Sequence, residues 1–211
     1  MANRYYTFAE HEFYHTYNRG NSKQAIFKCE SDYDRFTKLL YIANNSERFV
    51  MRELEDGIFD VDRKQILVHI GAYCLMSNHF HLLLAPAIEG GVSKFMLKLA
   101  TGYSTFFNKK YNRTGGLFEG PFKAKHIDSD RYLKYIFSYI HLNPYRDSHE
   151  RMHTHFSQPK LLEYRYSSLP DYLGEDRVVA KILSKDAFPK YFNEVKELKG
   201  ELMGWLDYQE I

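Results

Sequence analysis

The stretch 72–86, AYCLMSNHFHLLLAP, is the feature that most constrains the fold of this chain. It is an apolar run broken once, at Ser77 and Asn78, and it carries His79 and His81 two residues apart. Because successive side chains of an extended strand point to opposite faces, the two imidazoles would share one face of a sheet. Such a pair supplies half of a metal site, and ordinary hydrogen-bonded strand histidines are the alternative.

Composition indicates a globular protein with one core, or one core and a small appendage. The chain has 211 residues, of which 44% are hydrophobic, enough to bury a sizeable core. The longest apolar run, 82–87, is far too short to span a bilayer, and the N-terminal residues lack the apolar segment of a secretory signal. Cys29 and Cys74 lack a paired spacing, which argues against a disulfide framework or a zinc finger. We therefore expect a cytoplasmic protein with no membrane segment.

Hydrophobic periodicity predicts alternating strands and helices. The expected strands are 13–17, 65–71 and 73–85, the last two being one strand or two. The expected helices are 31–44 with Ser31 as N-cap, 92–108, and 129–143, which Pro144 should end because the α region is disfavoured before proline. This alternation predicts an α+β fold, an antiparallel sheet with helices packed on one face. Two short helical patterns, 178–183 and 188–206, predict a C-terminal helical extension.

The segment 109–126, KKYNRTGGLFEGPFKAKH, is the most basic part of the chain. It places six Lys, Arg or His residues against Glu119 and interleaves them with Tyr111, Phe118 and Phe122. Phosphates attract cations and bases stack on flat apolar groups, so this composition suits a single-stranded nucleic acid. Because the net charge is only +2, a polyanion would meet a local patch and not the whole surface. A plain charged loop is the alternative.

Two further groups of residues carry possible chemistry. Arg19 and Lys23 lie in a turn cluster where a loop could touch phosphate, with a solvated hairpin tip as the alternative. On the helix predicted for 129–143, Tyr135, Tyr139 and Asn143 follow a spacing of four and line one face. An aromatic packing stripe accounts for the neighbouring Tyr132, Ile136 and Ile140 better than for an amide in line with two phenols.

Five segments, in this order, resemble a known family: YHTYNRGNSKQAIF, AYCLMSNHFHLLL, TGGLFEGPFKAKHID, YLKYIFSYIHLNPYR and YRYSSLPDYLG. Together they span roughly residues 14–173 and resemble the single-tyrosine HUH transposases, in particular the REP-associated tyrosine transposases. Many members of that branch carry Arg where Pro121 stands, so one expected DNA contact is altered in this chain.

The resemblance implies a ferredoxin-like HUH nuclease fold, with a catalytic domain at 1–150 and the helical extension at 151–211 packed on it. It implies that Tyr139 is the nucleophile that forms a 5′-phosphotyrosine link, and that a divalent metal, Mg²⁺ or Mn²⁺, is held by His79, His81 and Asn143. The implied partner is single-stranded DNA in a hairpin or palindromic repeat, and a homodimer is left open. The expected DNA-binding residues are Arg19, Lys23, Lys109, Lys110, Arg113, Lys123, Lys125 and Arg146.

Two other functions compete with a transposase. One is a catalytically inactive or repurposed protein of the same fold that only binds single-stranded nucleic acid. The other is a metal-dependent hydrolase of a small phosphoester with water as nucleophile, against which the absence of an Asp or Glu cluster near the histidines counts. If Tyr139 is not the nucleophile, Tyr135 is the next candidate, ahead of Tyr103 and Tyr111.

Overall fold

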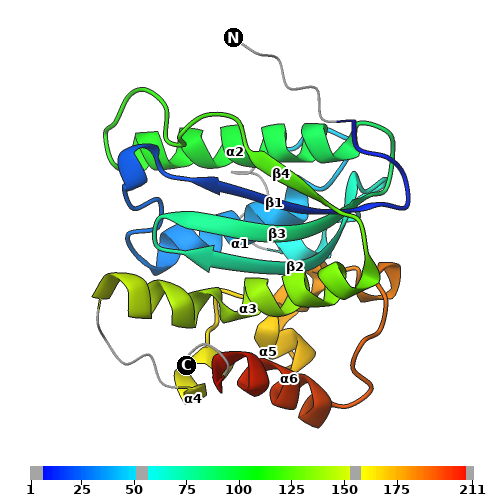
Figure 1. Ribbon diagram of the computed structural model, residues 1–211. Helices are drawn as coiled ribbons and strands as arrows, with labels where there is room; N and C mark the ends of the chain where they lie inside the picture. The colour runs from blue at the N-terminus through cyan, green and yellow to red at the C-terminus, as the bar shows by residue number, and fades with distance from the viewer. Residues whose placement is uncertain (1–6, 51–56, 153–157, 208–211) are drawn as a thin grey trace.

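A four-stranded antiparallel sheet forms the centre of the computed structural model, which describes residues 7–50, 57–152 and 158–207 (Figure 1). Its strands are β1 (Phe13–Arg19), β2 (Val68–Met76), β3 (His79–Pro86) and β4 (Lys123–Ile127), in the order β2-β3-β1-β4. The turn at Ser77 and Asn78 joins β2 and β3 into a hairpin, so the predicted boundary between these strands, at residue 72, was too early. The strand β4, inside the basic segment, was not predicted.

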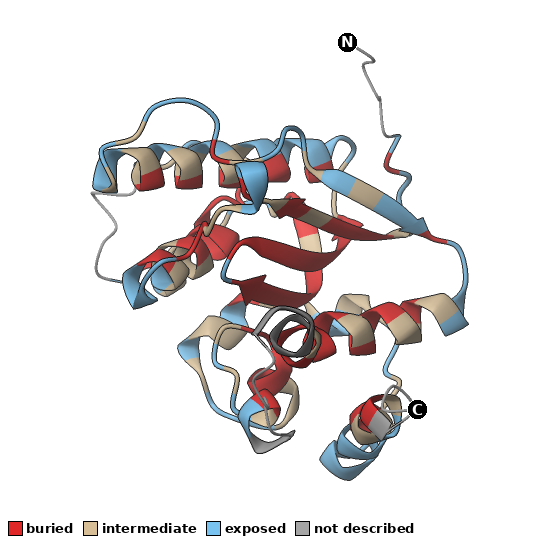
Figure 2. Cartoon of the chain, turned by 60° about the vertical axis from the view of Figure 1, so that its left-hand side comes forward, coloured by how far each residue is buried: buried red, intermediate tan, exposed pale blue. Residues whose placement is uncertain are grey.

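Helices cover both faces of this sheet. The helices α1 (Glu30–Ile42) and α2 (Gly91–Lys110) share one core with Phe80, Leu82 and Leu84 of β3, whereas α3 (Asp130–Met152) shares a second core with Leu83. Figure 2 shows the buried strands between these helical layers. The α+β class and the antiparallel sheet are confirmed. The expectation of helices on one face only is corrected, because the central strand β3 is apolar and buried on both sides.

The C-terminal part of the chain packs against α3 and β2. It contains α4 (Gln158–Leu162), α5 (Leu169–Tyr172), α6 (Val195–Asp207) and short 3₁₀ helices at Val178–Ile182 and Lys185–Ala187. Earlier in the described chain, 3₁₀ helices also occur at Asn21–Lys23 and Ile58–Asp60. The backbone N–H of Ser168 donates to the carbonyl of Tyr73 at 3.0 Å, and Leu202 of α6 is buried in the α3 core. A division at residue 150 stays a prediction, and α3 runs across that position.

The helix limits differ from the sequence prediction in three places. The N-cap of α1 is Cys29 and not Ser31, because the carboxylate of Asp32 accepts the N–H of Cys29 and caps the helix two residues earlier. The pattern 188–206 becomes helical only at Val195. Pro144 lies inside α3, and packing of Tyr145 in the α3 core offsets the hydrogen bond that the proline removes. None of the helices in these ranges has the length and hydropathy needed to cross a bilayer.

Candidate active site

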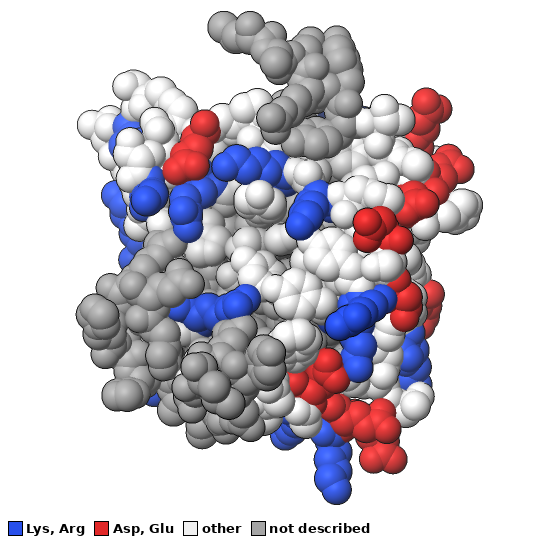
Figure 3. Space-filling model, in the orientation of Figure 1, with Lys and Arg blue, Asp and Glu red and all other residues white. Residues whose placement is uncertain are grey.

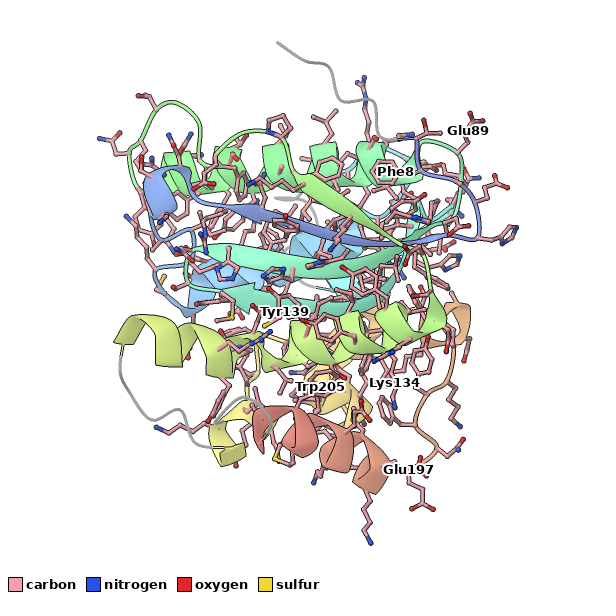
Figure 4. All side chains as sticks on the ribbon, in the orientation of Figure 1. Phe8, Glu89, Lys134, Tyr139, Glu197 and Trp205 are labelled. Atoms are coloured by element: carbon pink, nitrogen blue, oxygen red, sulfur yellow. The ribbon has the colours of Figure 1, made fainter. Side chains whose placement is uncertain are left out.

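A cleft of about 620 Å³ lies between the sheet and α3. Polar and aromatic side chains from four elements line it: His15, Tyr17, His79, His81, Lys123, Lys125, Tyr132, Tyr135, Tyr139, Asn143 and Arg146. In Figure 4, Tyr139 projects from α3 toward the sheet. All four residues predicted for catalysis and metal binding, His79, His81, Tyr139 and Asn143, therefore line one cleft.

Strand pairing places the histidines side by side. Strands β1 and β3 are antiparallel neighbours in which Tyr17 stands opposite His81 and Arg19 opposite His79. Because side chains alternate along a strand, His15, Tyr17 and Arg19 turn to the same face as the two β3 histidines. The adjacent residues Phe80 and Leu82 turn to the α1 and α2 core, which fixes the direction of the imidazoles.

The two β3 histidines are held by different partners. The rings of His79 and His81 are 5.0 Å apart at 88°. The Nδ1 atom of His79 lies 2.7 Å from Oδ1 of Asn78, and the Nδ1 atom of His81 lies 2.8 Å from Nε2 of His15. Both rings are thus buried and oriented, with exposed fractions of 8% and 6%.

Burial favours the uncharged form of the His81 and His15 imidazoles. It lowers the pKa of His81 well below the usual 6.5, and the positive charge of Arg19 acts in the same direction. Burial also lowers the pKa of His15 to about 4, with a further effect of Lys125. A neutral imidazole has a nitrogen lone pair and can therefore bind a metal ion without first losing a proton.

Tyr139 contacts the imidazoles of His81 and His15. Its ring lies 5.6 Å from that of His81 and 5.8 Å from that of His15, both nearly perpendicular, and the Arg146 guanidinium is 5.2 Å from the phenol ring. One turn later, the side-chain Nδ2 of Asn143 donates to the backbone carbonyl of Tyr139 at 2.8 Å. This bond orients the amide so that Oδ1 is available as an acceptor.

Residues 47–143 match the family model described as IS200-like transposase. The match covers 97 of the 211 residues, a little under half of the chain. The matched range contains His79, His81, Tyr139 and Asn143, and the recognition of this family from the sequence is confirmed. As a group, transposases act on DNA, so the family supports an enzyme whose substrate is DNA.

The fold of the chain is similar to a solved structure, that of a REP-associated tyrosine transposase bound to a REP hairpin. The two share 12% sequence identity at a TM-score of 0.51, over 90% of this chain and 95% of the other. At that identity the likeness shows a common fold. None of the curated proteins compared with the sequence matches it.

The predicted DNA-binding residues divide into two groups. Arg19, Lys123, Lys125 and Arg146 line the cleft, where Glu119 is the one acidic residue among the described lining residues. Lys23, Lys109, Lys110 and Arg113 do not line it. Lys110 instead forms an ion pair with Asp32 beside α1. Figure 3 shows Lys and Arg side chains on both sides of a band of other residues, with Asp and Glu mainly toward one edge of this face.

The donor set of the cleft fits a divalent metal ion. Two imidazoles and an amide oxygen suit several divalent cations and do not select strongly among them. In the ranges that the structure describes, no three His, Cys, Asp or Glu side chains are arranged to hold a metal. The amide of Asn143, or another neutral oxygen, would therefore have to complete such a site.

Sequence reasoning missed the contribution of β1. His15 and Tyr17 line the cleft, and Asn78 contacts His79, yet none of them was predicted as a site residue. Alternation within 13–17 is a signal that His15 and Tyr17 share a face. Nothing in the sequence indicates that this strand pairs with β3, so their approach to His81 becomes visible only in the folded chain.

Proposed function

We propose that the chain is a metal-dependent DNA transposase that nicks and joins single-stranded DNA through Tyr139. The supporting observation is that Tyr139 lies in one cleft with His79, His81 and Asn143, inside the segment that matches the family. A small-phosphoester hydrolase fits less well, because the cleft is lined by cations and by four tyrosines, and Glu119 is the one acidic group among the described residues that line it. That lining suits a long polyanion with stacking bases.

Both reactants need assistance from the cleft. A phosphodiester is anionic and a poor electrophile, and a phenol with a pKa near 10 is a weak nucleophile at neutral pH. His79, His81 and Asn143 would hold Mg²⁺ or Mn²⁺, which when bound polarises the scissile phosphate and neutralises charge in the transition state. Arg19, Lys123 and other cleft cations would bind the flanking phosphates, as the charge of the backbone requires.

The chemical step is a transesterification. The phenolic oxygen of Tyr139 forms a bond to phosphorus while the bond from phosphorus to the 3′ oxygen breaks. The phenolic proton is lost to the surrounding water, and the departing 3′ oxygen gains one. Because the new phosphotyrosine ester conserves the energy of the broken bond, a 3′-OH can later reverse the step and join DNA ends without a nucleotide cofactor.

The proposed substrate is single-stranded DNA folded into a hairpin or palindromic repeat. The structure to which this fold is similar holds a REP hairpin. In this chain Tyr17, Tyr132 and Tyr135 line the cleft, and flat rings of this kind stack on unpaired bases. A cytoplasmic location and a homodimer with shared sites remain predictions.

The deciding experiment compares Tyr139→Phe with Tyr135→Phe, a matched loss of a phenolic hydroxyl one helical turn away. Each protein is incubated with Mn²⁺ and single-stranded DNA that folds into a palindromic hairpin, and denaturing gels detect a covalent adduct. We expect an adduct with the wild type and with Tyr135→Phe, and none with Tyr139→Phe or after chelation of the metal. Normal cleavage by Tyr139→Phe would refute the assignment. Tight hairpin binding without any adduct by the wild type would favour the binding protein of the same fold.

A further inference from the structure

Each candidate metal-ligating histidine has its Nδ1 atom next to a polar group supplied by the protein. For His79 the partner is Oδ1 of Asn78 at 2.7 Å, and for His81 it is Nε2 of His15 at 2.8 Å. The two partners come from different places, one from the β2–β3 turn and one from β1. The arrangement is therefore repeated at both histidines by unrelated parts of the chain.

A partner at Nδ1 decides which nitrogen can bind a metal. A neutral imidazole carries one N–H and one lone pair, so an acceptor at Nδ1 holds the proton there and places the lone pair on Nε2. Asn78 meets this requirement because its Nδ2 donates to the carbonyl of Lys23 at 2.9 Å, which turns Oδ1 toward His79. The amide is thus an acceptor of fixed orientation.

The partner of His81 is less constrained, because an imidazole can accept or donate. If Nε2 of His15 donates a hydrogen bond to Nδ1 of His81, the single ring proton of neutral His81 is on its own Nε2. The Nε2 atom of His81 then has no lone pair with which to bind a cation. If Nε2 of His15 accepts, the proton of His81 sits on Nδ1 and the lone pair on Nε2. Only the second arrangement is compatible with His81 as a ligand through Nε2.

We propose that His15 is a positioning residue whose Nε2 accepts the Nδ1–H of His81 and so fixes the tautomer in which His81 presents Nε2 to a divalent cation. Asn78 has the same role toward His79. This inference rests on the proposed function, because the cation is the one assigned to that site. Hydrogen-bond partners of ligating imidazoles commonly act in this way.

The surroundings of His15 hold its ring in place for this role. The ring is 6% exposed and lies beside that of His81, with the ring centroids 5.0 Å apart and the ring planes 25° apart. Its edge contact with Tyr139 at 5.8 Å and its contact with Tyr17 at 5.2 Å restrict it on two further sides. A ring confined by three aromatic neighbours presents Nε2 to His81 without a large loss of side-chain freedom when a cation binds.

The test uses His15→Gln and His15→Phe in the full-length protein without DNA. Glutamine places an amide oxygen near the position of the His15 Nε2 atom and so keeps a hydrogen-bond acceptor. Phenylalanine keeps an aromatic ring but removes the acceptor. His141→Phe is the matched control, because His141 is also buried, its Nε2 contacts Ser168 at 2.7 Å, and it lies outside the cleft. Calorimetry measures Mn²⁺ affinity, and long-range nitrogen–proton NMR of the metal-free protein reports the tautomer of His81.

We expect His15→Phe to bind Mn²⁺ about 10- to 100-fold more weakly than the wild type, the usual effect of removing such a partner. His15→Gln and His141→Phe should stay within about threefold of the wild type. In the NMR spectra, His81 should carry its proton on Nδ1 in the wild type and in His15→Gln, and shift toward Nε2–H in His15→Phe.

Three results would overturn the inference while leaving the proposed function intact. These are a folded His15→Phe that binds Mn²⁺ as the wild type does, an equal loss in His15→Gln and His15→Phe, or an Nε2–H tautomer of His81 in the wild type. The last needs no substitution, so it decides the matter even if His15→Phe does not fold. Failure of the wild type to bind Mn²⁺ would instead refute the metal site of the proposed function, and this inference with it.

Discussion

At the scale of single residues, buried histidines make the stability of this protein depend on pH. Burial lowers the pKa of His141 to about 3, and this residue contacts Ser168 on the far side of α3 from the cleft. In the unfolded chain a histidine titrates near 6.5. Between these two values the unfolded state binds a proton that the folded state does not, so stability falls as the pH falls.

His141→Gln should remove this part of the pH dependence. Glutamine can keep a hydrogen bond to Ser168 but does not titrate. Between pH 7.5 and pH 5.0, the free energy of unfolding of the variant should therefore fall by about 2 kcal/mol less than that of the wild type. Urea unfolding at the two pH values measures the difference. An equal fall in both proteins would show that the buried imidazole does not cause it.

The residues of the candidate site were predicted unevenly. Strand alternation predicted that His79 and His81 share one face, and helix spacing predicted the same for Tyr139 and Asn143, because both are local properties. That the two groups meet was implied only by the family resemblance, and these residues do line one cleft. His15 was not predicted, since its approach to His81 depends on which strands are neighbours. Half of the expected DNA-binding residues lie outside the cleft, and this too depends on the arrangement of the elements in space. The segment 109–126 begins at the end of α2, on one side of the sheet, and ends in β4, at the edge of the sheet.

At the scale of elements, α3 contains a feature that local rules exclude. Pro144 lies within the helix, where it cannot donate to the carbonyl four residues earlier and its ring crowds that turn. The sequence predicted that the helix ends there, because the backbone preference of a residue that precedes proline can be read from the sequence. The helix continues past the proline because Leu142 and Tyr145 pack in the α3 core, and this packing cannot be read from the sequence.

Pro144→Ala should stabilise the protein. Alanine restores the missing donor and relieves the crowding, so the free energy of unfolding should rise by about 1 to 3 kcal/mol in thermal or urea unfolding. Pro170→Ala is the control, because Pro170 lies in the first turn of α5, where proline is tolerated and no such gain is expected. A loss of stability in Pro144→Ala would mean that the proline shapes α3 for its packing on the sheet.

At the scale of the whole molecule, the attraction for DNA must come from the cleft. The net charge of +2 is too small for the protein surface as a whole to hold a polyanion. The same net charge would suit a protein that binds no nucleic acid, so the distribution of cations is the informative property. Lys123 and Lys125 line the cleft, whereas Lys109 and Arg113 do not.

The double variant Lys123→Gln/Lys125→Gln should weaken binding of a DNA hairpin by about tenfold at 0.15 M salt. The slope of the logarithm of affinity against the logarithm of salt concentration should become shallower by about 1.4, because two phosphate contacts on a single strand are lost. Fluorescence anisotropy over a salt series measures both. Lys109→Gln/Arg113→Gln removes two charges outside the cleft, and we expect its affinity to stay within about twofold of the wild type. Equal losses in the two variants would place DNA on both regions.

The position of β1 in the sheet also bears on how the protein is made. This strand leaves the ribosome first, yet it pairs with β3 and then with β4, whose residues follow more than a hundred positions later. Such distant pairings are slow to form. During translation, β1 can therefore pair with β3 once residue 86 has emerged, but its other edge stays unpaired until β4 follows. The imidazole of β1 can meet its partner on β3 at that earlier stage, whereas the tyrosine of α3 can cover both only after residue 139 has been added, so fragments that end before α3 should be catalytically silent.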